Sequence, residues 1–391
     1  MLGFFKYFNF FIDSFSNLLI QVGFQPNIKT LQIILPVGIS FYTFQSLSYS
    51  IDIYRGKIKP TNDFISFMTF VSFFPQLVAG PIERASNLLP QFLKAREFNQ
   101  EQMVSGLRFI LYGLFKKMVI ADRLAYFVDY IYDSPGKHDG TVTLVATFMF
   151  GFQIYCDFSG YSDIAIGSAR LLGFDLMQNF KTPYLARNFR EFWRRWHISL
   201  STWFRDYVYI PLGGNRVSYI RWIFIVLLTF TLSGLWHGAS LTFIIWGFLH
   251  GLFLISENFI SKFISLPKRF LWLGFLITFI TVNLTWIFFR SGSLEQSMTI
   301  LSGLNNLDLD FIPKAVSLFA EDNTFREFTV SLMAGFPIFL LFEILINQND
   351  FDHLVKKTGV IFRWGIYLLF VLMILIFGVL NSAPQFIYFQ F

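Results

Sequence analysis

The sequence predicts an all-α, polytopic membrane protein, and three observations lead to that prediction. The chain of 391 residues is 54% hydrophobic and only 14% charged, whereas a soluble domain carries about 25% charged residues. Fifty-four phenylalanines are too many for one soluble core, so much of the surface must face lipid. Several apolar runs reach the roughly 20 residues that a helix needs to cross a bilayer. These runs are continuous rather than alternating, which favours helices over a β-barrel.

About ten segments are expected to be embedded in the membrane, and several of them reach the length that a bilayer requires. They run approximately over residues 2–22, 31–49, 64–78, 103–131, 142–173, 222–236, 241–255, 270–289, 328–346 and 361–380. Lys6, Asn9 and Asp13 interrupt the first of them. Residues 83–102 and 291–327 are more polar and are expected outside the membrane. No repeat or linker divides the chain, so we expect a single membrane domain over residues 1–391, with its most distinctive sequence between residues 70 and 260.

Composition and motifs also exclude several classes of protein. The single cysteine, Cys156, excludes an internal disulfide and a zinc site built on several cysteines. The net charge of +6 is spread over short loops, as in membrane proteins with positive cytoplasmic loops, and does not indicate nucleic-acid binding. HExxH, Walker A, GxGxxG and CxxC patterns are absent, so neither a metal nor a nucleotide site is predicted. Ser233 and Ser240 lack the GxSxG setting of serine hydrolases, and no cleavable signal peptide is evident after Met1.

Polar and helix-breaking residues inside the apolar runs point to specialised structure. Pro75, Gly80 and Pro81 predict a broken helix or re-entrant turn, which must be covered by protein or line a wet cavity. Asp157 and Asp163 lie in the apolar run 142–173 and therefore need partners. The arginines of the next segment are the expected partners. A further charge cluster, at 116–123, is expected to mark an interface with the membrane surface.

Residues 181–221 form an unusual basic and aromatic segment. Read as one helix, it places aromatic and leucine side chains on one face at spacings of three and four. These residues are Phe189, Phe192, Trp193, Trp196, Leu200, Trp203 and Tyr207. His197 lies one turn after Trp193, at the edge of that face. The pattern is typical of an amphipathic helix that lies at an interface or lines a cavity.

His237 is the strongest single candidate for a functional residue. An ionisable side chain in an apolar region is costly and points to function, and a near-neutral histidine is suited to general-base work on a hydroxyl. The neighbouring Gly234 and Gly238 allow two interpretations: close helix packing or space for a substrate. His250 is thirteen residues further on and would face the opposite side of a continuous helix, so it is assigned a structural role. His138 and His353 lie in polar loops and are expected to be solvated.

Four stretches together resemble the membrane-bound O-acyltransferase family, and most closely its alginate O-acetyltransferase branch. They are FPQLVAGPI (74–82), YCDFSGYSD (155–163), FWRRWHISLS (192–201) and LWHG (235–238). The resemblance covers residues 1–290 and implies a ring of helices, thinned at its centre, with a tunnel that joins the two faces of the membrane. Members of this branch usually have two or three further spans before the equivalent of residues 4–11, and we expect these to be missing from the present chain.

The resemblance also implies site residues and substrates. Its essential histidine corresponds to His237, and a second site residue corresponds to His197. The implied donor is acetyl-CoA or another acyl thioester that enters from the cytoplasm as a substrate, with no bound cofactor. Trp196 or Trp236 is expected to help His197 to orient the acceptor or to stabilise the oxyanion. Arg194 and Arg195 are expected either to meet coenzyme A phosphates or to pair with Asp157, Asp163 or lipid headgroups.

The predicted function is therefore an O-acyltransferase of a bacterial cytoplasmic membrane that acylates hydroxyls of an extracytoplasmic polysaccharide. One alternative is an acyl relay to a periplasmic partner transferase, including D-alanyl transfer to teichoic acid. A covalent acyl-partner intermediate would favour that relay. The other alternative is a transporter or flippase, since buried polar residues also line substrate paths, although the two-half symmetry common in transporters is not evident.

Overall fold

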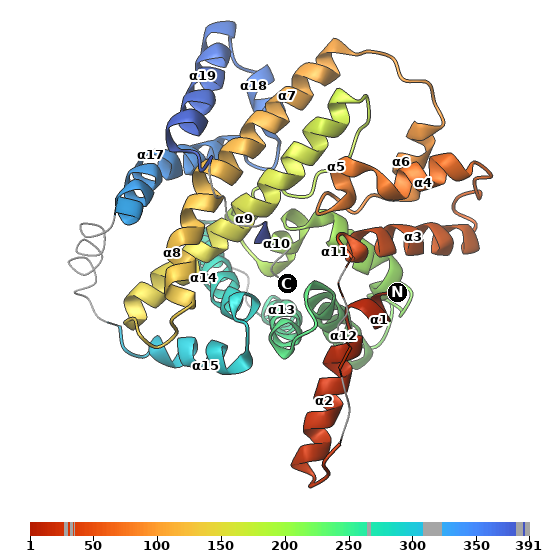
Figure 1. Cartoon of the computed structure of the whole chain (residues 1–391), viewed down its shortest axis with the longest axis vertical. Helices are drawn as coiled ribbons and strands as arrows, with labels where there is room; N and C mark the ends of the chain where they lie inside the picture. The colour runs from red at the N-terminus through yellow and green to blue at the C-terminus, as the bar shows by residue number, and fades with distance from the viewer. Residues whose placement is uncertain are drawn as a thin grey trace.

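A computed structural model describes residues 1–26, 30–31, 34, 36–263, 267–307, 323–380 and 386–387. All regular structure in these residues is helical, as the fold class predicts (Figure 1). The elements are α1 (Leu2–Phe5), α2 (Phe8–Gln21), α3 (Ile39–Tyr54), α4 (Phe64–Ser72), α5 (Phe74–Leu77), α6 (Ala85–Phe92), α7 (Gln100–Leu114), the π-helix η1 (Phe115–Ala121), α8 (Asp122–Tyr132), α9 (Gly140–Leu171), η2 (Pro183–Leu185), α10 (Phe189–Arg195), α11 (Ile198–Phe204), the π-helix η3 (Arg205–Tyr209), α12 (Tyr219–His237), α13 (Leu241–Ile260), η4 (Lys268–Phe270), α14 (Leu271–Arg290), α15 (Leu294–Gly303), α17 (Asn323–Ile346), α18 (Phe351–Lys356) and α19 (Val360–Phe377).

Six helices in the described part of the chain are long and apolar enough to cross a membrane: α9, α12, α13, α14, the 328–346 part of α17, and α19. The prediction of about ten embedded segments is thus met only in part. The first predicted segment divides into α1 and α2, where α2 has 14 residues, and the second begins at Ile39 rather than near residue 31. These two runs are rich in phenylalanine, but neither of them forms one unbroken helix over its predicted length.

The longest helices form an antiparallel pair that runs through the middle of the molecule (Figure 1). α7, η1 and α8 follow one another without a break and pack along α9, which confirms the helices predicted over 103–131 and 142–173. Glycines let the two backbones approach closely: a Cβ on Gly113 would lie 2.7 Å from the carbonyl oxygen of Gly160. Close packing of this kind between helices is favoured by small residues where lipid offers no hydrophobic driving force.

The carboxylates of α9 find their partners on η1, and the predicted pairing with arginines is wrong. Lys117 Nζ lies 2.8 Å from Asp157 Oδ1 and 2.7 Å from Asp122 Oδ1. Lys116 Nζ lies 2.7 Å from Asp163 Oδ2. The physical reason is that η1 packs directly against α9 and brings both lysines to these carboxylates, whereas Arg195 is paired with Glu191 and Arg194 is exposed. The predicted interfacial charge cluster is also wrong in part, because Lys116 and Asp122 are buried inside the helix bundle.

The proline-containing stretch is broken, as predicted. α4 ends at Ser72, the short α5 follows, and an extended segment leads to α6. Protein covers this backbone: the side-chain amide of Gln76 is buried and donates to the carbonyl of Phe70 over 3.2 Å. Glu83 is buried as well and accepts hydrogen bonds from Asn87 Nδ2 and from the backbone N–H of Met177. The broken element is therefore tied into the interior rather than exposed to lipid.

Candidate functional site

The basic, aromatic segment is not one helix, and its break lies at His197. α10 ends at Arg195, Trp196 is extended, and His197 has φ 42° and ψ 54°, in the left-handed region. A non-glycine residue in that region costs about 1–3 kcal/mol and persists only where its surroundings hold it. Six of the seven residues of the predicted face, Phe189, Phe192, Trp193, Trp196, Leu200 and Trp203, are buried, and Tyr207 is half-buried, but they lie on separate short helices and not on one helix. The break turns His197 away from the course of a regular helix.

Asn179 fixes the imidazole of His197. Its Oδ1 lies 3.1 Å from His197 Nδ1 and also accepts from the N–H and the hydroxyl of Ser199, over 3.2 and 2.9 Å. Its Nδ2 donates to Ser162 Oγ over 3.3 Å, so Oδ1 is the acceptor toward the histidine. Nδ1 therefore carries the proton and the imidazole lone pair is on Nε2. Burial lowers the pKa of His197 to about 3, so the neutral form with this tautomer dominates near pH 7.

His237 is the last residue of α12, and its imidazole lies beside that of His197. The centroids of the two imidazole rings lie 6.1 Å apart, and both side chains are buried. The indole of Trp236 contacts both, at 6.1 Å from His197 and 5.1 Å from His237. Trp246 and Phe289 pack on the remaining sides of His237, at 5.2 and 5.3 Å. Two histidines that are forty residues apart in the sequence thus lie together in a single centre lined by aromatic rings.

The glycines beside His237 serve close packing. A Cβ on Gly234 would lie 2.1 Å from the carbonyl oxygen of Phe243, and one on Gly247 would lie 2.2 Å from that of Phe230. A Cβ on Gly238 would overlap the Phe243 ring at 2.1 Å. α12 and α13 are therefore in backbone contact, and the tight connection between them holds His237 at the turn. Of the two interpretations left open by the sequence, the structure supports close packing.

Two indole N–H groups at the site have no acceptor within the described part of the chain: Nε1 of Trp236 and Nε1 of Trp246. Both indoles are almost fully buried, at 3% and 1% exposure. A buried donor without a partner costs about 1–3 kcal/mol. These N–H groups are therefore suited to a ligand that enters the site.

His250 is held apart from the pair. Its Nε2 lies 3.0 Å from Thr285 Oγ1, and that hydroxyl donates to the carbonyl of Val282 over 2.6 Å, so His250 donates to Thr285. Trp246 contacts His250 at 4.9 Å as well as His237 and lies between them. The structural role expected for His250 agrees with this geometry. Of the other two, His353 is exposed, but His138 is half-buried against the Tyr130 ring rather than fully solvated.

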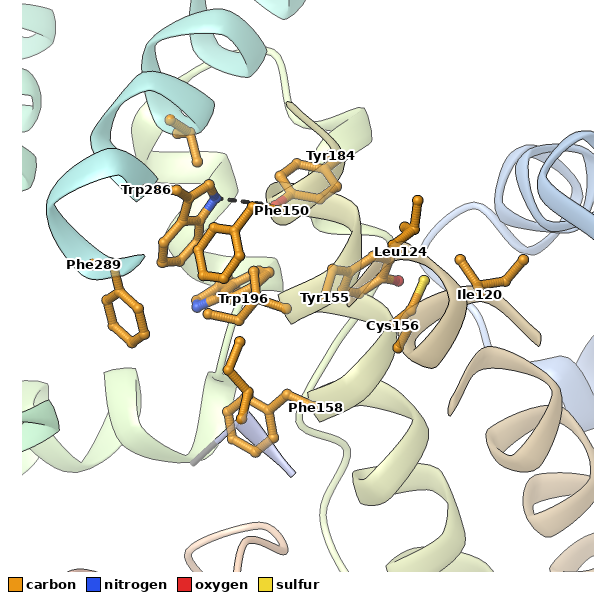
Figure 2. Close-up of a cluster of buried hydrophobic side chains, with 14 of the residues drawn as sticks. Ile120, Leu124, Phe150, Tyr155, Cys156, Phe158, Tyr184, Trp196, Trp286 and Phe289 are labelled. Carbon is orange, nitrogen blue, oxygen red and sulfur yellow. Dashed lines mark hydrogen bonds between the residues drawn. The ribbon is translucent and has the colours of Figure 1, made fainter. Parts of the chain in front are cut away.

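The remaining predicted residues are placed differently from one another. Trp196 packs among Tyr184, Phe192 and Trp286, with its ring centroid 5.1 Å from that of Trp286 (Figure 2). Arg195 is buried; it pairs with Glu191 and donates to the carbonyl of Thr182 over 3.2 Å. Arg195 is therefore used inside the fold, and neither arginine pairs with Asp157 or Asp163. Arg194 is exposed.

Sequence reasoning missed two residues at the site. Asn179 lies in the loop after α9 and carries no signal of its own. Lys6 donates from Nζ to the carbonyls of Trp236 and His237, over 2.8 and 2.9 Å. Its position in an apolar run was a usable signal, because an ionisable residue in such a run needs a partner.

Replacing Asn179 tests the orientation of His197. Asn179→Leu removes the acceptor oxygen that holds His197 Nδ1 and Ser199, so we expect turnover to fall roughly tenfold to a hundredfold, because a displacement of about 1 Å at a site can reduce a rate about a hundredfold. Asn179→Asp keeps an acceptor oxygen and should lose much less. Turnover per mole of folded protein, with fold checked by thermal denaturation in detergent, is the measurement. Wild-type turnover in Asn179→Leu would contradict the assigned tautomer.

Comparison with known proteins identifies the family. The sequence profile described as MBOAT, membrane-bound O-acyltransferase family, matches residues 58–294. The chain belongs to the membrane-bound O-acyltransferase family. This confirms the resemblance carried by the four motifs, and the six apolar helices agree with a multi-pass membrane protein. His197 and His237 lie inside the matched range, and Lys6 lies outside it.

Three relatives show the breadth of the family around this chain. A probable alginate O-acetylase of Pseudomonas aeruginosa is 44% identical over 295 residues, which cover 75% of this chain and 56% of the relative. A peptidoglycan O-acetyltransferase of Helicobacter pylori is 36% identical over 100% of this chain and 80% of the relative. A teichoic acid D-alanyltransferase of Bacillus subtilis is 29% identical over 64% and 65%. The chain thus spans a little over half the length of the alginate O-acetylase.

Proposed function

We propose that this protein transfers an acyl group, most simply acetyl, from a cytosolic thioester to hydroxyls of an extracytoplasmic polysaccharide. The observation that carries the proposal is the pair of buried histidines, 6.1 Å apart between ring centroids, and we infer that two elements from opposite sides of the membrane bring them together. One of these elements is the outer end of α12, and the other is the segment that connects α9 to α12.

The distribution of positive charge supports this sidedness. The segments that connect α9 to α12, α13 to α14 and α17 to α19 contain seven, three and two Lys or Arg residues, twelve in all. The segments that connect α12 to α13 and α14 to α17, on the opposite side, contain none and two. Cytoplasmic connections carry the excess of Lys and Arg. His197 therefore belongs to a cytoplasmic connection that reaches inward, and His237 lies at the extracytoplasmic end of its helix.

His237 acts as the general base in the proposed reaction. It removes the proton from the acceptor hydroxyl as the oxygen attacks the thioester carbonyl. The carbon–sulfur bond then breaks, and the imidazolium returns the proton to the departing thiolate. The aromatic walls exclude bulk water, which limits hydrolysis of the thioester. Protons balance within the site, so no further acid or base is required.

The geometry divides the supporting roles. His197 carries its proton on Nδ1, so its Nε2 is an acceptor that suits a hydrogen bond from a neighbouring hydroxyl of the acceptor, which orients the acceptor and leaves the proton of the reacting hydroxyl to His237. The oxyanion requires a donor instead. Trp236 offers a buried N–H next to both histidines. It suits that role better than Trp196, whose ring packs among Tyr184, Phe192 and Trp286. Arg194, exposed on a cytoplasmic connection, remains a candidate for the phosphates of coenzyme A, whereas Arg195 is already paired.

A second candidate is favoured by the relationship to a teichoic acid D-alanyltransferase: the same site would pass a D-alanyl or acetyl group to a periplasmic partner transferase. The chemistry at the histidines is unchanged, and the difference lies in the acceptor. A covalent acyl-partner intermediate, trapped by acid quench and detected by mass spectrometry, would favour the relay over direct transfer. Transport activity without any acyl ester product would instead favour a transporter.

Deleting the gene tests the function in cells. We expect the ester-linked acetyl content of cell-surface glycans to fall, with recovery when the wild-type gene is restored. Acetate released by mild alkali from purified glycans is the measurement, and ester-linked D-alanine is measured in the same extracts to distinguish the two acyl groups. Unchanged amounts of both esters would contradict the proposed function.

A further inference from the structure

Lys6 is an ionisable residue in an apolar run that the proposed chemistry does not use. It follows the short helix α1, outside the residues that match the family profile. Its ammonium donates to the carbonyl oxygens of Trp236 and His237, over 2.8 and 2.9 Å, and to Ser40 Oγ over 3.4 Å. It also lies 5.9 Å from the centroid of the Trp236 ring. All of these partners belong to the wall of the site or to α3 beside it.

The carbonyls that Lys6 contacts are the last ones of α12. A helix ends with backbone carbonyls that have no partner within the helix, and its C-terminal end carries partial negative charge. A lysine ammonium satisfies both needs, since it is positive and has three donors. At this helix end the two carbonyls belong to the residues whose side chains form the site. Fixing those two peptide units fixes the Cα–Cβ directions of Trp236 and His237.

Residues near Lys6 complete the same wall. The ring of Phe41 lies 5.5 Å from that of Trp236, and the ring of Phe44 lies 5.3 Å from it. The opposite side of His237 is held by Trp246 of α13 and Phe289 of α14. On the α3 side, Lys6 ties the backbone of α12 to the N-terminal part of the chain.

We propose that Lys6 is a positioning residue for His237 and Trp236, acting through their backbone carbonyls. This inference rests on the proposed function, in which His237 is the general base and Trp236 donates a hydrogen bond to the oxyanion. Lys6 does not touch the reacting atoms. It holds the end of α12 so that imidazole and indole face the acyl group at reacting distance, where small displacements are costly in rate.

The test compares Lys6→Met with Lys6→Arg in purified, reconstituted protein supplied with acetyl-CoA and a hydroxyl acceptor. Lys6→Met keeps the apolar stem and loses charge and donors, so we expect kcat to fall at least about tenfold. The KM for acetyl-CoA should stay within about twofold, because donor binding is untouched. Lys6→Arg restores the charge and the donors and should recover at least about a third of wild-type kcat. Lys59→Met, on an exposed lysine, is the matched control and should behave as wild type.

A purely structural anchor gives a different result. If Lys6 only stabilised the fold, Lys6→Met would lower the thermal midpoint in detergent and the yield, but kcat per mole of folded protein would stay at the wild-type value. Wild-type kcat in folded Lys6→Met, or a Lys6→Arg variant as slow as Lys6→Met, would overturn the proposal. If Lys6→Met does not accumulate, Lys6→Gln takes its place with the same thresholds. Wild-type protein and His237→Ala in the same assay separate the two ideas. No ester from the wild-type protein would refute the proposed function, and wild-type activity in His237→Ala would refute its role as the base. An active wild type and an inactive His237→Ala beside a fully active Lys6→Met would refute only the role of Lys6.

Discussion

The His237→Ala variant is expected to lose acyl transfer while it still accumulates in membranes. Removing the imidazole removes the group that takes the acceptor proton, and general acid–base catalysis contributes a factor of about 10² to 10⁴. The rings of Trp236, Trp246 and Phe289 pack against this imidazole, so the substitution disturbs packing at one end of α12 only. Formation of labelled ester from labelled acetyl-CoA by purified, reconstituted protein is the measurement.

Two other histidines provide the controls. His353→Ala alters an exposed side chain and should retain wild-type turnover. His250→Leu breaks the hydrogen bond to Thr285 and should lower the thermal midpoint more than it lowers turnover per folded molecule. Wild-type turnover in His237→Ala would contradict its role as the base. Complete loss in His250→Leu with an unchanged thermal midpoint would show that the two roles have been assigned to the wrong residues.

Gly234→Ala is expected to abolish the proposed acyl transfer by displacing the backbone, without removing any group that takes part in the chemistry. Its Cβ would lie 2.1 Å from the carbonyl oxygen of Phe243, and a backbone atom in a packed helix cannot turn aside. The overlap forces α12 and α13 apart, at a cost of about 1–3 kcal/mol. It also displaces the end of α12, where His237 lies three residues further on. A displacement of about 1 Å can reduce a rate about a hundredfold.

Gly251→Ala is the matched control on the same pair of helices. Its Cβ would meet side-chain atoms of Leu227 and Phe230 at 3.3 Å and the Cα of Leu227 at 3.4 Å, contacts that a small shift relieves. We expect most of the turnover to be retained. Thermal midpoint and turnover measured on both variants separate packing from catalysis. Full activity in Gly234→Ala would contradict the backbone contact between α12 and α13.

Hydrophobic length predicted the long helices well and the short ones poorly. α9, α12, α13 and α14 agree with the expected ranges because their apolar runs are unbroken. The N-terminal run is interrupted by polar residues and divided by a turn at Lys6. The break at His197 could not be predicted, because period-three and period-four spacing continues across it, and only tertiary contacts such as Asn179 hold the left-handed conformation. Charge pairing failed for a similar reason, since Lys116 and Lys117 reach α9 through packing that sequence order does not reveal.

The two histidines proposed for the centre of the site could be singled out from the sequence because their chemistry is conspicuous. His197 and His237 are ionisable residues in aromatic, apolar surroundings, where such groups point to function. Asn179 is a polar loop residue whose importance appears only from its distance to His197. Lys6 was visible as a charge in an apolar run, but its partners are backbone carbonyls, and these have no side-chain signature. The arginines show the reverse: Arg195 looked available and is buried in a local ion pair.

The most direct test of the account uses proteoliposomes in which the orientation of the protein is known from protease protection. Acetyl-CoA with a labelled acetyl group is supplied on one side and the hydroxyl acceptor on the other, in both arrangements. We predict labelled ester only when the donor faces the Lys- and Arg-rich connections and the acceptor faces the opposite side, and only with His237 intact. Ester formed equally in the reversed arrangement, or formed equally by His237→Ala, would contradict transfer across the membrane at this pair of histidines.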